Sequence, residues 1–137
     1  MKPAGFVDTS AFYALTDSKD QNHVAARRQL RAFMRERRAL VTSTYVLDEL
    51  FTLVRMRLGH RIAVKLGEEM LKSRWCEVFE VSQETRLAAW QLFVRYDDQT
   101  FSFTDCTSFA LMRTLELDIA FTFDRKDFRA AGFSPVP

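Results

Sequence analysis

The stretch Ala4-Gly5-Phe6-Val7-Asp8-Thr9-Ser10 decides the fold, because an apolar run ends at an acid that two hydroxyl residues follow. Residues 4–7 are predicted to form a short buried strand. Thr9 and Ser10 are favourable residues for starting a helix, and a brief helix is predicted to run to Leu15. The chain therefore begins as strand, acid and helix.

The alternation of strands and helices continues along the chain. Further strands are predicted at residues 39–42, 75–81 and 118–123, the second near a sheet edge and the third as the last clear strand. Helices are predicted at residues 23–38, 44–58, 61–73, 83–96, 104–115 and from 124 to about 132, with Ser43 or Thr44 and Ser82 as N-caps. Strands separated by helices favour a parallel α/β sheet with right-handed crossovers. We expect residues 1–137 to form a single domain with one sizeable core.

Composition excludes several classes of protein. The hydrophobic fraction is 47% with only four Gly and three Pro, which excludes disordered and fibrous chains, and the 13 Phe residues are interpreted as core packing. The formal charge of +2 is too balanced to establish a polyanionic partner by itself. Cys76 and Cys106 are interpreted as buried thiols in a reducing compartment. We expect no signal peptide and no membrane-spanning segment, and therefore a cytoplasmic location.

Four acids, Asp8, Glu49, Asp105 and Asp124, each lie near the end of a different hydrophobic stretch. Burying an unpaired carboxylate is costly, so each acid needs compensation. Asp8 and Asp124 directly follow predicted strands, Asp105 begins a predicted helix, and Glu49 lies one turn into another. Sites in parallel sheets form outside the carboxyl ends of the strands. Local structure therefore places all four acids at one end of the sheet.

Each acid also has a purely structural interpretation. Asp8 and Asp124 could be helix N-caps, and Asp105 could interact with the positive end of a helix dipole. Glu49 has the weakest such explanation, because the neighbouring Asp48 can take the solvated position. The conjunction of four acids favours a shared site for Mg²⁺ or Mn²⁺, which prefer oxygen ligands. Zinc is disfavoured, because the two histidines lie far in sequence from both cysteines.

In order and spacing, the motifs around these acids resemble the PIN-domain nucleases, and most of all the VapC-type toxins of toxin–antitoxin pairs. The motifs are Phe6-Val7-Asp8-Thr9-Ser10, the helical Glu49, Ser102-Phe103-Thr104-Asp105-Cys106-Thr107-Ser108, and Thr122-Phe123-Asp124-Arg125-Lys126-Asp127-Phe128. The resemblance implies a three-layer α/β/α fold with a short, mainly parallel central sheet. It also implies endoribonuclease activity that depends on Mg²⁺ or Mn²⁺.

The resemblance also assigns site residues and partners. The family's acids fall on Asp8, Glu49, Asp105 and Asp124, and Ser10 matches its small polar residue. Asp127 is a further possible ligand, and the choice between Asp124 and Asp127 stays open. The implied partners are an RNA substrate, a cognate antitoxin and a second copy of the chain in a homodimer. No membrane partner is expected.

The basic residues are interpreted by their positions. Arg125 and Lys126 directly follow Asp124 and are the best choice to contact a phosphate. A stripe at helical spacing is interpreted as a solvated helix face, and it consists of Arg27, Arg31, Arg35 and Arg38. A role in RNA or partner binding stays open for the cluster around Gly59, which consists of Arg55, Arg57, Arg61 and Lys65.

Other functions fit the sequence less well. A haloacid-dehalogenase-like phosphatase needs a second Asp two residues after the first, where this chain has Ser10. A catalytically silent RNA- or protein-binding module would be expected to lose acids, whereas all four are present. An RNA-processing PIN nuclease without an antitoxin remains an alternative. A short upstream gene for a DNA-binding protein with a disordered tail would favour the toxin.

Overall fold

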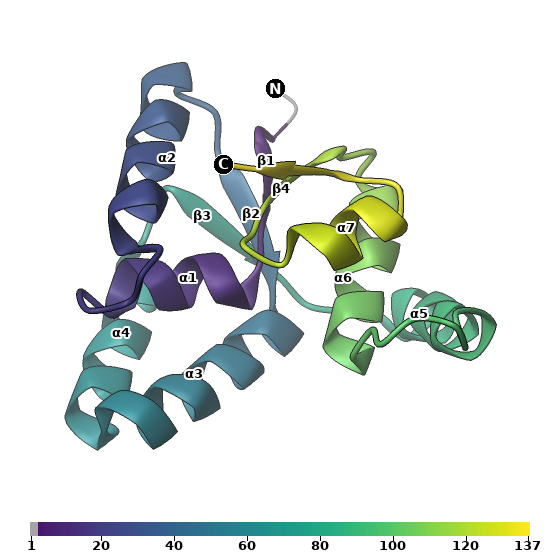
Figure 1. Cartoon of the computed structure of the whole chain (residues 1–137), viewed down its shortest axis with the longest axis horizontal. Helices are drawn as coiled ribbons and strands as arrows, with labels where there is room; N and C mark the ends of the chain where they lie inside the picture. The colour runs from purple at the N-terminus through teal and green to yellow at the C-terminus, as the bar shows by residue number, and fades with distance from the viewer. Residues whose placement is uncertain (1–2) are drawn as a thin grey trace.

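The computed structural model describes residues 3–137, which form a single parallel sheet and seven helices (Figure 1). The strands are β1 (Gly5–Val7), β2 (Leu40–Ser43), β3 (Cys76–Phe79), β4 (Ile119–Phe121) and β5 (Ser134–Val136). The helices are α1 (Thr9–Thr16), α2 (His23–Glu36), α3 (Thr44–Leu58), α4 (His60–Lys72), α5 (Gln83–Arg95), α6 (Phe103–Thr114) and α7 (Arg125–Ala130). The strand order is β3-β2-β1-β4-β5, and every neighbouring pair is parallel.

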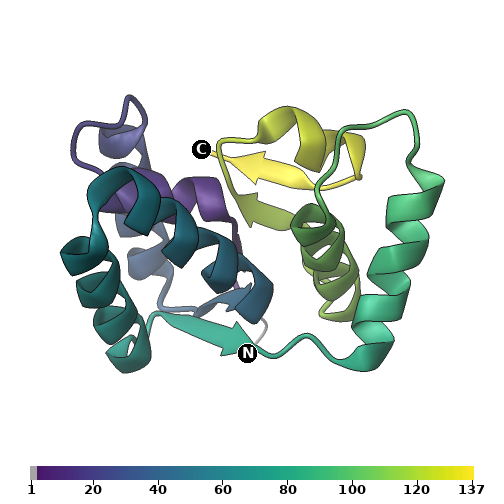
Figure 2. The same cartoon turned by 90° about the horizontal axis from the view of Figure 1, so that it is seen from below.

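The helices cover the two faces of the sheet. Helices α1 to α4 lie on one side of it and α5 to α7 on the other (Figures 1 and 2). On the first side α1 packs against α2 and α3, and on the second α5 packs along α6. The predicted three-layer α/β/α fold with a parallel central sheet is therefore confirmed.

The strand order creates a topological switch between β1 and β4. From β1 the chain builds outward through β2 and β3, and then returns to the other side of β1 to add β4 and β5. Ligand sites in open α/β sheets form at such a switch, outside the carboxyl ends of the strands. The two strands approach closely at Gly5, where an added Cβ would lie 2.9 Å from the Ile119 carbonyl oxygen. Gly5 therefore permits the β1–β4 contact that forms the switch.

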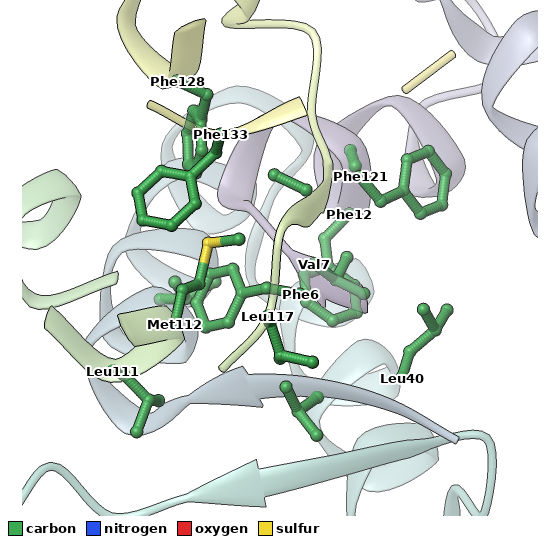
Figure 3. Packing of buried hydrophobic residues seen from close by; sticks show 14 of the residues in the cluster. Phe6, Val7, Phe12, Leu40, Leu111, Met112, Leu117, Phe121, Phe128 and Phe133 are labelled. Atoms are coloured by element: carbon green, nitrogen blue, oxygen red, sulfur yellow. The ribbon is translucent and has the colours of Figure 1, made fainter. Parts of the chain in front are cut away.

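Phenylalanines dominate the core, as the composition predicts. Eight of the 13 Phe side chains are buried, and Figure 3 shows several of them between the sheet and its flanking helices. Phe109 of α6 is central, because its ring contacts those of Phe101, Phe128 and Phe133 with centroids 5.0 to 5.7 Å apart. Burying one such side chain contributes about 1.5–3 kcal/mol. These contacts fix α6 and α7, the helices that carry three of the acids, against the sheet.

The predicted elements are all present, with some differences at their ends. Ser43 and Ser82 cap α3 and α5 as expected, each hydroxyl oxygen accepting a backbone N–H three residues on. The predicted helix 23–38 ends earlier, at Glu36, because Arg37 adopts a left-handed conformation with φ of 56°. The strands at 75–81 and 118–123 are shorter than predicted, and β3 lies at a sheet edge as expected.

The prediction that residues 118–123 form the last strand was wrong. Residues 134–136 form the edge strand β5, which pairs with β4. The sequence hid this strand because it is three residues long and contains Pro135, which cannot donate a ladder hydrogen bond. An edge strand tolerates that loss. None of the helices in residues 3–137 is long and apolar enough to cross a bilayer.

Candidate metal centre

Strand β1 carries Asp8 to the carboxyl end of the sheet, between β2 and β4. The Asp8 backbone N–H donates to the Phe121 carbonyl oxygen over 3.0 Å, which fixes the residue against β4. The residue is only 5% exposed. Although Asp8 occupies the N-cap position of α1, its side chain makes no capping hydrogen bond. Helix capping therefore does not account for this buried acid.

Two hydroxyl groups hold the Asp8 carboxylate. Ser10 Oγ and Thr122 Oγ1 donate to its Oδ2 over 2.9 and 2.8 Å. The two hydroxyl oxygens in turn accept the backbone N–H groups of Phe123 and Asp124, both over 2.9 Å. Hydrogen bonds of this kind favour the ionised acid, but burial outweighs them and raises the pKa of Asp8. The network therefore orients a carboxylate that is costly to keep charged.

Thr122 is a site residue that sequence reasoning did not single out. It is fully buried, and its hydroxyl joins Asp8 to the backbone of Asp124. The available signal was a hydroxyl residue directly after an apolar strand and two residues before an acid. Ser10 was predicted as a supporting residue on family resemblance, and the structure shows a contact through which it could support Asp8.

Asp105 lies in the first turn of α6, where it also caps the helix. Its Oδ2 accepts the Ser102 backbone N–H over 3.0 Å, and the Ser102 hydroxyl accepts the Asp105 N–H over 3.0 Å. This reciprocal pair is a capping box, so the structural interpretation of Asp105 is confirmed. Burial, followed by the charge of Asp8, raises the pKa of Asp105 to about 7. A capping role alone would not need an acid whose ionisation is so disfavoured.

Helix α7 supplies Asp124 and Asp127, and the structure brings both next to Asp105. Carboxylate oxygens of these three acids lie within 4.8 Å of one another. Burial and the neighbouring Asp127 raise the pKa of Asp124 to about 6. Both residues that the sequence left as alternatives for one position therefore lie in the same cluster.

Glu49 is the one acid of the predicted four whose side chain is exposed. It lies on the first turns of α3, where its side chain is exposed, as is that of Asp48. It does not belong to the cluster of Asp105, Asp124 and Asp127. Its charge nevertheless contributes to the raised pKa of Asp8, as the smallest of the causes. Glu49 therefore borders the site from the α3 side.

The donor set of this cluster fits a hard divalent cation. Mg²⁺ binds oxygen ligands at about 2.0–2.1 Å, which places neighbouring ligands about 3 Å and opposite ligands about 4 Å apart. Oxygens within 4.8 Å of one another need only small movements to reach that geometry. A cation would also offset the burial and the mutual repulsion that raise the pKa values of Asp105 and Asp124.

The histidines and nearby basic residues have separate roles. His23 Nδ1 lies 2.7 Å from the Ala14 carbonyl oxygen and His60 Nδ1 lies 2.7 Å from an Arg55 nitrogen. Both contacts are local packing interactions, as the sequence suggested. Arg125 and Lys126 are exposed in the first turn of α7, and the Arg125 guanidinium lies 5.9 Å from the centre of the Phe123 ring.

The raised pKa of Asp105 predicts how the metal-free protein responds to pH. An acid with a pKa near 7 in the fold and near 3.8 unfolded binds protons more readily when folded. Its contribution to stability is therefore present at low pH and is lost as the pH rises from about 4 to about 7. Asp105→Asn removes the charge and keeps an oxygen for the capping box. Above about pH 7, in EDTA, we expect the variant to melt roughly 4 °C higher than wild type and to gain less from Mn²⁺.

Thermal melts across this pH range, with EDTA or Mn²⁺, check this expectation. Asp118→Asn is the matched control, because Asp118 is exposed before β4, at the opposite end of the sheet. A metal-free Asp105→Asn protein that melts well below wild type, with an undiminished gain from Mn²⁺, would show that Asp105 only caps α6.

Comparison with known proteins agrees with this fold and cluster. The family model of the PIN domain matches residues 5–134. The chain is 40% identical over 131 residues to the 23S rRNA-specific endonuclease VapC20 of Mycobacterium tuberculosis, covering 96% of each chain. The crystal structure of that sarcin-ricin loop cleaving toxin matches with a TM-score of 0.87 and 37% identity, covering 96% of this chain and 97% of that one.

A more distant structure shares the fold alone. VapBC2 from Rickettsia felis, bound to a DNA fragment from its promoter, matches with a TM-score of 0.73 at 11% identity, covering 97% of this chain and 98% of that one. The family match over nearly the whole chain confirms the resemblance that the ordered acids predicted. This chain belongs to the PIN-domain family, among its VapC-type members.

Proposed function

We propose that this protein is an endoribonuclease toxin that hydrolyses RNA phosphodiester bonds with Mg²⁺ or Mn²⁺ bound by its acidic cluster. The observation that carries this proposal is the cluster of Asp105, Asp124 and Asp127 beside the buried Asp8, at the switch between β1 and β4. The similarity to VapC20, named for its action on 23S rRNA, supports ribosomal RNA as the first substrate to test.

Each residue at the site has its own proposed role. Asp8, Asp105, Asp124 and Asp127 would hold the cation, while Ser10 and Thr122 keep Asp8 oriented. A bound Mg²⁺ or Mn²⁺ lowers the pKa of a coordinated water and neutralises charge on the phosphate oxygens. Arg125 and Lys126 are exposed beside Asp124, where they can pair with phosphates that flank the cleaved bond.

Substitutions at the site should lower the cleavage rate to different extents. Asp8→Asn, Asp105→Asn and Asp124→Asn should each lower the Mn²⁺-dependent rate by more than about 100-fold, because each removes a proposed ligand charge. Thr122→Val, which releases the Asp8 carboxylate and the Asp124 backbone N–H but removes no proposed ligand, should cost about 10–100-fold. Asp127→Asn should harm less than Asp124→Asn, because Asp127 lies a turn into a short helix while the Asp124 backbone is held by Thr122.

The rates are measured on purified ribosomal RNA and on mixed cellular RNA with Mg²⁺, Mn²⁺ or EDTA, and the new RNA ends are mapped. Glu49→Gln should cost less than the three aspartate variants, because Glu49 is exposed whereas Asp8 is buried and Asp105 and Asp124 are partly buried. Asp118→Asn should cleave at the wild-type rate. Wild-type cleavage by any two of the three aspartate variants Asp8→Asn, Asp105→Asn and Asp124→Asn would contradict the proposed site.

A cognate antitoxin is the second part of the proposal. Its tail would cover the acidic cluster and place an arginine among the carboxylates, where a guanidinium can pair through two parallel hydrogen bonds. The raised pKa values of Asp105 and Asp124 support such a contact, because a guanidinium, like a cation, would compensate partly buried carboxylates that also repel one another. A short upstream gene for a DNA-binding protein distinguishes this toxin from an RNA-processing nuclease without an antitoxin.

Helix α5 is the surface that we propose for homodimerisation. Its buried residues pack on α6, and its outer side exposes apolar residues with exposed fractions of 42% to 59%, namely Leu87, Trp90, Phe93 and Val94. The rings of Trp90 and Phe93 lie 5.8 Å apart and form one patch. Figure 2 shows α5 at the outer edge of the molecule, where a second copy can reach it.

A charge in the α5 patch should disrupt the dimer. Trp90→Glu places a carboxylate where the proposed contact would be dry, so we expect a monomer at concentrations at which wild type is a dimer. Sedimentation equilibrium measures the two masses. Leu71→Glu is the control, because Leu71 is 89% exposed on α4, away from the patch. A monomeric wild type, or a dimer that only Leu71→Glu disrupts, would exclude this interface.

A further inference from the structure

Helix α2 and the residues after it hold the chain's excess of positive charge. Residues 23–38 contain six arginines and one glutamate, a net charge of +5. The whole chain carries +2, so the other 121 residues together carry −3. The nearly balanced composition therefore conceals a strong separation of charge, and separated charge is what attracts a polyanion.

These arginines have little compensation within the fold. Arg27, Arg31 and Arg35 are exposed at intervals of four residues on α2, where like charges repel. Within residues 3–137 the one ion pair closer than 4 Å joins Arg38 to Glu36 at 2.8 Å. A solvated face was the expected interpretation of this stripe, but such a face is usually interspersed with acids. Here the arginines of α2 repel one another, and a negatively charged partner would relieve that repulsion.

A hollow of about 430 Å³ adjoins the end of α2, and three more arginine side chains line it. The lining residues are Met34, Arg37, Arg38, Ala39, Arg74 and Trp75. Arg37 has a φ of 56°, in the left-handed region that glycine adopts at lower cost. The half-buried Trp75 adds an aromatic side chain next to the guanidinium groups. Cationic groups beside an aromatic ring suit a nucleotide, which offers a phosphate and a flat base.

The hollow at the end of this surface, with Arg37, Arg38 and Arg74, lies at the other end of the sheet from the acidic cluster. Arg38 and Arg74 precede β2 and β3, whose first residues Leu40 and Cys76 pair in the sheet. Helix α2 runs back along the sheet toward this end (Figure 1). From Arg27 to Arg35 the arginines of α2 extend over about 12 Å at 1.5 Å per residue, and Arg37 and Arg38 lengthen the stripe beyond the helix, so it can meet several phosphates.

We propose that this arginine face, made of Arg27, Arg31, Arg35, Arg37, Arg38 and Arg74, binds the phosphate backbone of a folded RNA substrate away from the cleaved bond. The proposal rests on the proposed function, and it adds a second contact that selects large structured RNA over short single strands. Guanidinium groups pair with phosphates in a fixed fork geometry. An RNA backbone offers a phosphate at every nucleotide along the stripe, and an unpaired loop base of a folded RNA can pack near Trp75, so RNA is a better fit than an acidic protein segment.

Binding to RNA in an Asp8→Asn background, which would bind without cutting, tests the proposal. Affinities for purified 23S ribosomal RNA and for a short single-stranded RNA are measured at increasing KCl. Arg31→Gln with Arg35→Gln should weaken binding of the long RNA by about tenfold or more and lower the salt slope by about two, one for each lost phosphate contact. Arg74→Gln, outside α2, should lower the slope by about one and checks that the effect does not come from altered helix stability.

The matched control is Arg86→Gln with Arg113→Gln, which removes two exposed charges from α5 and α6. An equal loss in this control would show a general charge effect and overturn the proposal, as would unchanged RNA binding in the α2 variant. If the α2 variant loses antitoxin binding but keeps its affinity for RNA, the face is a protein-binding surface, and the RNA proposal is overturned.

Cleavage assays separate this proposal from the proposed function. In the active background, the α2 variant should cleave the short RNA at the wild-type rate and the long RNA more slowly. If wild type cleaves neither RNA, the proposed nuclease activity is overturned. If wild type and the α2 variant cleave both RNAs at equal rates, only the proposed role of the arginine face is overturned.

Discussion

The burial of several carboxylates close together at the switch between β1 and β4 is the constraint on which the site depends. Asp105 and Asp124 have pKa values raised to about 7 and about 6, and burial raises that of Asp8 as well. No contact in the described fold neutralises the cluster with a basic side chain. The surrounding structure therefore holds in place a group of charges that lowers the stability of the metal-free protein, and a divalent cation is the natural means of relieving it.

The fold supplies the rigidity that such a group needs. β1 and β4 fix the backbones of Asp8 and Thr122, and the Phe109 contacts hold α6 and α7 against the sheet. The hydroxyls of Ser10 and Thr122 then tie the first acid to the backbone that leads into α7. Asp8, Asp105 and Asp124, which lie far apart in sequence, thus meet at one end of the sheet on elements that packing holds together.

Sequence patterns predicted the parallel sheet with its helices, because these depend on local apolar periodicity, whereas the three layers were implied by the family resemblance. Three of the four acids singled out next to strand and helix ends, Asp8, Asp105 and Asp124, lie together in the structure. Strand β5 escaped prediction, since three residues with a proline give no periodic signal. The exposure of Glu49 also escaped, because the angle at which α3 leaves β2 depends on tertiary packing. The same holds for Thr122, whose role depends on a partner 114 residues away, and for the hollow that joins Arg74 to the end of α2.

Charge is distributed unequally over the two ends of the sheet. The carboxyl end gathers the acids of the proposed metal site, and the arginines of α2 continue to the amino end, where Arg37, Arg38 and Arg74 line one hollow. A net charge of +2 hides both features, since they nearly cancel. The separation gives a simple physical picture of a nuclease that would hold its substrate by one surface and cut it at another.

Anomalous diffraction from crystals grown with Mn²⁺ near neutral pH tests the central claim most directly. The account predicts a Mn²⁺ peak contacted by carboxylate oxygens of Asp105, Asp124 and Asp127, with Asp8 bound directly or through water. Manganese found only elsewhere on the protein, with these carboxylates contacting water or basic side chains in the same crystal, would contradict it.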